Sequence, residues 1–141
     1  MNWIETMEEQ IRAEAEARDL IREQAPGLFD ELWRALREQV KEATKVPRFA
    51  SLKHRREDGL ITYQVPGPVA LDVERRLLVR LEPNNPRVVA WGTDMESVTI
   101  DFQVGADNRV DFVVDGKRCD CANAAERILR AFLYPESPLT K

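Results

Sequence analysis

The chain has 141 residues, of which 43% are hydrophobic and 33% charged, and its formal net charge is −4. This length and composition are typical of one globular domain with one core, which we expect to span residues 1–141. The chain has no apolar run of the roughly 20 residues that a membrane span requires, and no segment is basic enough for general nucleic-acid binding. We therefore expect a cytoplasmic protein with no membrane partner and no nucleic-acid partner.

Residues 1–46 predict a pair of helices divided at Ala25-Pro26-Gly27, because proline removes a helix donor. Asn2 and Glu5 have the spacing of a capping box at the start of the first helix. Both helices carry apolar residues at spacings of three and four, namely Ile4, Met7, Ile11, Ala15, Leu20 and Ile21 in the first and Leu28, Phe29, Leu32, Trp33, Leu36, Val40 and Ala43 in the second. The pattern leaves open whether the helices form an antiparallel hairpin or one bent arm.

Residues 47–119 predict an antiparallel sheet of about seven strands, because the apolar period changes from 3.6 to 2 and turn residues recur at short intervals. The clearest hairpin joins residues 98–104 to residues 110–114. One register sets its six apolar residues on a single side: Val104 opposite Val110, Phe102 opposite Phe112, and Ile100 opposite Val114. A slip of one residue would turn polar side chains to that side, so burial of the side fixes the register.

Two further hairpins are predicted from turn residues. The first turns at Asp58-Gly59, and a two-residue loop there pairs Leu52 with Val65 and His54 with Tyr63, with His54 on the inner face. The second joins residues 69–73 to residues 77–81 around Glu74-Arg75-Arg76. After the turn Pro83-Asn84-Asn85-Pro86, residues 87–91 form a short strand.

Residues 120–134 predict a C-terminal helix capped by Asp120, and residues 135–141 form a loose tail. The apolar face of this helix comprises Ala125, Ile128, Leu129, Phe132 and Leu133. The fold class is therefore α+β: an N-terminal helix pair, then a curved antiparallel sheet or partly open barrel, closed by one C-terminal helix. Because Leu78 and Val113 fall on the second face of the sheet, we expect a helix to cover that face or the open end of the sheet.

Cys119-Asp120-Cys121 brings two thiols and a carboxylate together, but a tetrahedral zinc site needs further ligands. The single histidine, His54, lies 65 residues before Cys119. No serine or cysteine nucleophile at a recognisable motif accompanies His54, so His54 is not predicted to be catalytic. Trp3, Trp33 and Trp91 are expected in the core. The sequence thus indicates no metal site, no cofactor and no catalytic residue, and it favours a function other than catalysis.

The basic residues Lys53, Arg55 and Arg56 surround His54 in a run without acids, and Lys53 and Arg55 are expected on the outer face of their strand. With Tyr63 opposite His54, these residues form a candidate site for a small anionic ligand. Charged residues of this kind also protect an edge strand from unwanted pairing.

Two functions follow from these patterns. The first is a non-enzymatic interaction or adaptor module that uses its helical arm, with Ile4, Met7 and Ile11 as the interface to a protein partner or to a second copy in a homodimer. The alternative is an anionic-ligand-binding domain with a pocket between the curved sheet and the C-terminal helix, formed by Lys53, His54, Arg55, Arg56 and Tyr63.

Overall fold

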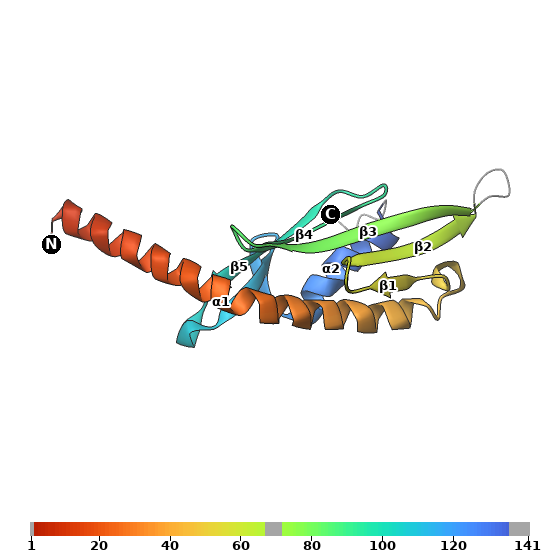
Figure 1. The fold of residues 1–141 in the computed structure, drawn as a ribbon, viewed down its shortest axis with the longest axis horizontal. Coiled ribbons are helices and arrows are strands. Elements are labelled where there is room, and N and C mark those ends of the chain that lie inside the picture. Colours follow the sequence, from red (N-terminus) through yellow and green to blue (C-terminus); the bar gives the residue numbers. More distant parts are fainter. Residues whose placement is uncertain (1, 67–71, 136–141) are drawn as a thin grey trace.

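The computed structural model describes residues 2–66 and 72–135, and it places two helices and a seven-stranded antiparallel sheet there (Figure 1). The strands lie in chain order in the sheet, which is open rather than closed into a barrel, so the α+β class is confirmed. In order, the elements are α1 (Trp3–Ala43), the 3-10 turn Pro47–Phe49, β1 (Lys53–Arg55), β2 (Leu60–Pro66), β3 (Asp72–Glu82), β4 (Arg87–Gly92), β5 (Val98–Val104), the 3-10 turn Ala106–Asn108, β6 (Val110–Val114), β7 (Lys117–Cys119) and α2 (Cys121–Leu133).

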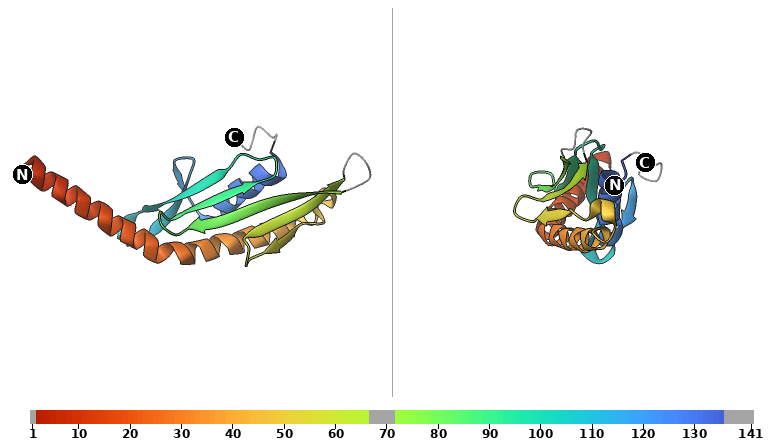
Figure 2. Two further views of the ribbon diagram at one scale, coloured as in Figure 1. Left: turned by 45° about the horizontal axis from the view of Figure 1, so that its top comes forward. Right: turned by 90° about the vertical axis from the view of Figure 1, so that its right-hand side faces the viewer.

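Helix α1 is one bent helix of 41 residues rather than two helices, so of the two predicted arrangements the structure has the bent arm and not the hairpin. Asn2 caps it by accepting a hydrogen bond from the Glu5 backbone N–H at 2.9 Å. Pro26 lies inside the helix, and the helix changes direction in that region (Figures 1 and 2). A proline within a helix removes one hydrogen bond and bends the axis, and here the helix continues because side chains on both sides of Pro26 contact the sheet.

The predicted β5–β6 hairpin is confirmed, with Phe102 opposite Phe112 and Val104 opposite Val110. The Asp115-Gly116 turn that follows has positive φ values at both residues and leads into β7, a short strand that the sequence did not predict. Helix α2 also agrees with its prediction. The Asp120 side chain accepts from the Asn123 backbone N–H at 2.8 Å, and all five residues of the predicted apolar face are buried.

The predicted register of the first hairpin is wrong, because His54 lies opposite Ile61 rather than Tyr63. Residues 56–59 form the connection in place of a two-residue loop. Gly59 explains the difference, since it has a φ of 61° and its backbone lies against β3. A Cβ atom at Gly59 would lie 2.3 Å from the Val79 carbonyl oxygen, so only glycine allows the two backbones to lie this close together.

The predicted turn at Glu74-Arg75-Arg76 is also wrong, because these residues lie within the 11-residue strand β3. Arg75 points to the inner face, where it is buried and donates to the Tyr63 hydroxyl at 2.5 Å and to the Thr93 carbonyl at 2.6 Å. A buried arginine interrupts the apolar alternation, which made the strand resemble a turn. The remaining residues of that predicted hairpin, 69–71, and the predicted tail from residue 136 lie outside the described residues.

Both helices pack against each other and against the same, concave face of the sheet (Figure 2). The predicted inner layer is confirmed, since Ile100, Phe102, Phe112 and Val114 are all buried in the core. Neither helix covers the second face, which was one of the two positions predicted for a covering helix. One concave face accommodates both helices because the curved sheet surrounds them, so the outer face stays open to solvent.

Candidate functional site

Residues 3–23 of α1, here called the arm, project away from the sheet (Figure 1). The predicted interface residues Ile4, Met7 and Ile11 lie there with 54%, 47% and 54% of their surface exposed. Trp3 joins them with 75% exposed, so the prediction that it belongs to the core is wrong. The signal for Trp3 was its spacing of four residues from Met7, which sets the two side chains on the same side of the helix. The arm thus presents a contiguous apolar stripe to solvent.

The end of the arm is acidic. Residues 3–11 contain Glu5, Glu8 and Glu9 and no basic residue. By helical periodicity, Glu8 lies one turn after Ile4 and Glu14 follows Ile11 by three residues, so these two carboxylates border the apolar stripe on its two sides. A surface that receives this stripe would therefore combine an apolar strip with basic flanks.

Two side-chain contacts fix the base of the arm to the sheet. The Gln24 side chain donates to the Asn108 carbonyl oxygen at 2.8 Å and accepts from the Val110 backbone N–H at 3.0 Å. Two residues earlier, Arg22 donates to the Asn84 carbonyl oxygen at 3.5 Å. These bonds join α1 to the β5–β6 turn and to the β3–β4 turn just before Pro26, and so they set the direction of the arm.

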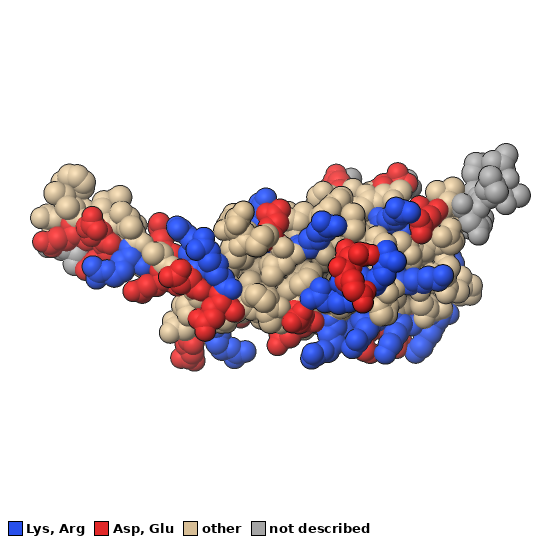
Figure 3. Space-filling view, viewed as in Figure 1, with Lys and Arg blue, Asp and Glu red and all other residues tan. Residues whose placement is uncertain are grey.

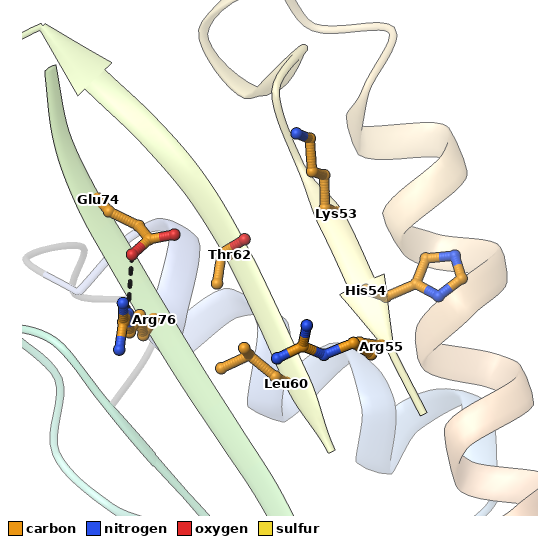
Figure 4. A pocket seen from close by; sticks show the side chains of 7 residues that line it. All are labelled: Lys53, His54, Arg55, Leu60, Thr62, Glu74 and Arg76. Carbon is orange, nitrogen blue, oxygen red and sulfur yellow. Dashed lines mark hydrogen bonds and ion pairs between the residues drawn. The ribbon is translucent and has the colours of Figure 1, made fainter. Parts of the chain in front are cut away.

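Four of the five residues predicted to bind an anionic ligand line two surface grooves, but neither groove holds all five: Lys53, His54 and Arg55 line one, and His54, Arg55 and Arg56 line the other. Lys53 and Arg55 lie on the outer face of β1, whereas His54 points to the opposite side, toward α1, where its ring lies 6.5 Å from that of Trp33 (Figure 4). Arg56 pairs with Asp30 of α1 at 2.6 Å. Tyr63 is buried in the core.

The space between β2 and α2, where the alternative function requires a pocket, holds packed aromatic rings. The Tyr63 ring centroid lies 5.4 Å from that of Phe49 and 5.3 Å from that of Phe132, and both pairs are edge-to-face. The Arg75 guanidinium lies 5.1 Å from the centre of the Phe132 ring. Side chains of the chain itself therefore fill this part of the interior.

The outer face instead has a shallow depression of about 360 Å³ over β1–β3 (Figure 4). Its lining includes Lys53, Arg55 and Arg76, together with one acid, Glu74, which pairs with Arg76 at 2.8 Å. In the space-filling view, basic side chains gather over this part of the body and acidic side chains over the arm (Figure 3). The two ends of the molecule therefore differ in charge.

An apolar row crosses the outer face beside this depression. The sheet register sets Leu60 directly opposite Leu78, and Leu78 directly opposite Trp91, on three neighbouring strands. Leu60 and Leu78 are half-buried, and Trp91 is 37% exposed, so the expectation that Trp91 belongs to the core is also wrong. We call Leu60, Leu78 and Trp91 the outer-face row. The sequence could not identify it, because it depends on the registers of three strands.

The outer-face row has basic residues on both sides. Arg76 and Arg80 precede and follow Leu78 by two residues on β3, so both side chains lie on the same face as Leu78. Arg55 lies opposite Leu60 at the β1 end of the row, and Arg80 stacks over the Trp91 ring at 5.9 Å. The row is thus an apolar strip flanked by arginines, of which Arg76 is paired with Glu74.

A second groove, of about 420 Å³, runs between α1 and β1. Arg34 and Arg37 of α1 face it, and neither makes an ion pair within residues 2–66 and 72–135. Sequence reasoning missed both arginines because they lie in a helix far along the chain from the basic run at residues 53–56. Their spacing of one helical turn, beside the apolar stripe, was the available signal.

The cysteine pair has the features of structural thiols. Burial raises the pKa of the Cys119 thiol, and the charges of Asp120, Asp115 and Cys121 raise it further, so this thiol stays protonated and weakly nucleophilic at neutral pH.

Among residues 2–66 and 72–135, no three His, Cys, Asp or Glu side chains are grouped as a metal site. No helix in the same ranges has the length and hydropathy needed to cross a bilayer.

Comparison with known proteins does not add to this geometry, because no family model, no curated protein and no solved structure matches the chain.

Proposed function

We propose that this protein is a protein-binding module that uses its arm as a docking helix. The observation that carries the proposal is the exposure of Trp3, Ile4, Met7 and Ile11 on a helix whose second half is buried in the core. A contiguous exposed apolar stripe is unusual on a monomer and commonly marks an interaction site.

The spacing of the stripe supports a particular mode of binding. Ile4, Met7 and Ile11 are related as i, i+3 and i+7, the positions at which an amphipathic helix inserts anchors into an apolar groove. Trp3 adds a large side chain of the kind enriched at interaction hot spots. The acidic residues that border the stripe would then select a partner with basic edges.

A photo-crosslinking experiment tests the proposal. A benzophenone amino acid replaces Met7, on the apolar side of the arm, or Glu9, which helical geometry places on the opposite side. After irradiation of intact cells, we expect a covalent adduct from position 7 and little from position 9, and we expect Ile4→Asp with Ile11→Asp to abolish it. Absence of any adduct from position 7, or equal adducts from both positions, would overturn the proposal.

The groove between α1 and β1 supports a second candidate, the binding of a small anion. Its specific support is the pair Arg34 and Arg37, which face the groove without ion-pair partners in the described ranges. Inorganic phosphate and citrate serve as probes in thermal unfolding, since a ligand at 100 times its Kd stabilises the folded state by about 2.7 kcal/mol. We expect Arg34→Gln with Arg37→Gln to remove the shift and the control Arg12→Gln in the arm to retain it. No shift with either probe counts against this candidate.

A further inference from the structure

We infer that the arm of one copy docks across the outer-face row of a second copy of this chain. The inference rests on the proposed function and adds the identity of the partner. It follows from a match between two surfaces of the same molecule in spacing, polarity and charge.

The spacing of the two surfaces agrees. At a rise of about 1.5 Å per residue, the three anchors from Ile4 to Ile11 span about 10.5 Å along the arm. Leu60, Leu78 and Trp91 lie on three neighbouring strands separated by about 4.8 Å each, so the row spans about 10 Å across the sheet. A helix laid over the row, perpendicular to the strands, can therefore set one anchor near each of its three residues.

The basic flanks also fit a helix in this position. Arg76 and Arg80 are four residues apart on β3, which separates their Cα atoms by about 13 Å, and a helix with its side chains is about 10–12 Å wide. The helix would lie between them, with Glu8, which is level with the middle anchor Met7, facing one of the two arginines. If Ile11 is set over Leu60, Glu14 lies past that end of the row, on the side of Arg55, which is opposite Leu60.

The receiving surface must belong to another copy. The arm projects away from its own sheet, and the Gln24 hydrogen bonds hold its base in that direction (Figure 1). The arm would have to break the helix to reach its own outer-face row. Pairing of two arms with each other is disfavoured, because the end of each arm is acidic and like charges repel. The basic outer face is the complementary surface.

Sedimentation velocity across a range of concentrations tests the inference. We expect association that weakens by about tenfold or more in Kd when Arg76→Glu and Arg80→Glu are combined, because the acidic arm then lies between two acidic side chains. The charge-swapped arm, Glu8→Lys with Glu14→Lys, should weaken association alone and restore it when combined with the swapped sheet. A matched control, Glu16→Lys with Glu23→Lys, makes the same change of charge on the side of the arm opposite the stripe and should leave Kd within about twofold.

Mixing two defective proteins separates lost binding from lost folding. One carries Ile4→Asp with Ile11→Asp and keeps an intact sheet, and the other carries Arg76→Glu with Arg80→Glu and keeps an intact arm. Each alone should be monomeric with a native circular dichroism spectrum, and the mixture should form a heterodimer. A mixture that stays monomeric while wild type associates would overturn the inference.

The photo-crosslinking experiment distinguishes this inference from the proposed function. An adduct of twice the mass of the chain, with the crosslinked peptide within residues 60–91, supports both. An adduct with a different protein, or a wild-type protein that stays monomeric at all concentrations, overturns the second copy as partner and leaves the docking arm standing. No adduct at all overturns both.

Discussion

The two halves of α1 belong to one helix and have opposite environments. After the bend, Phe29, Leu32, Trp33, Leu36 and Val40 are buried in the core, whereas before it Trp3, Ile4, Met7 and Ile11 are about half exposed or more. Both halves carry apolar residues at helical spacing. The buried half has the wider stripe, with two apolar residues in most turns, so the width of a stripe indicates whether a helix packs on its own domain.

The exposed half has few tertiary contacts to support its helical structure. Isolated helices of this length are marginal in water, since the first turn is costly to nucleate. The packed half supplies a preformed helix, from which the arm propagates through residues with good helix propensity, such as Ala13, Ala15 and Ala17. The arm therefore depends on the body for its structure, while the body does not depend on the arm.

The largest expected effect comes from a core residue of the packed half. Leu32 is fully buried, so Leu32→Ala should lower the free energy of unfolding by about 2–5 kcal/mol through lost burial and the cavity left behind. Ile4→Ala, a matched truncation in the arm, should change it by less than about 0.5 kcal/mol. Urea denaturation followed by circular dichroism measures both, and similar effects would refute the contrast between the halves.

An intermediate effect is expected where the halves meet. Gln24→Ala removes the acceptor of the Val110 backbone N–H, and Val110 is a buried residue, so we expect a loss of about 1–3 kcal/mol. Gln10→Ala is the control, since Gln10 lies exposed within the arm and should be neutral. The same urea titration compares the two variants. A neutral Gln24→Ala would mean that the arm is not fixed to the sheet through this side chain.

The smallest effect compares two helix caps of nearly equal geometry. Asn2 caps the arm at 2.9 Å and Asp120 caps α2 at 2.8 Å. Asp120→Ala should lower the global free energy of unfolding by about 1 kcal/mol, because α2 forms together with the core. Asn2→Ala should leave that free energy unchanged and increase amide hydrogen exchange in the first turns of the arm by about fivefold. A global loss with Asn2→Ala would show that the arm unfolds cooperatively with the body.

The sequence was sufficient wherever one pattern acted alone. The β5–β6 register and helix α2 were predicted because their apolar residues lie on one side and clear turn or cap residues bound them. The predictions failed where a tertiary contact prevailed over a local rule. Gly59 packs on Val79 and so shifts the β1–β2 connection, and Arg75 is buried by bonds to Tyr63 and Thr93 that no local pattern reveals.

The two candidate surfaces also differ in whether the sequence could predict them. The apolar stripe of the arm was predictable because it lies within one helix, where position along the chain determines which residues share a side. The outer-face row was not, because it joins β2, β3 and β4, and two of the predicted hairpins had the wrong pairing. The ligand set that included Tyr63 followed from one of those pairings.

Because the arm is attached to the sheet at Gln24, a small rotation there moves the far end of the arm by a much larger distance. About 20 residues separate Gln24 from Trp3, which corresponds to about 30 Å of helix, so a rotation of about 10° at the base moves the apolar end by about 5 Å. Two hydrogen bonds to the β5–β6 turn therefore govern where the exposed apolar residues of the arm lie. A displacement of this turn would therefore produce a larger displacement at the far end of the arm, and the turn can control the position of the apolar residues there.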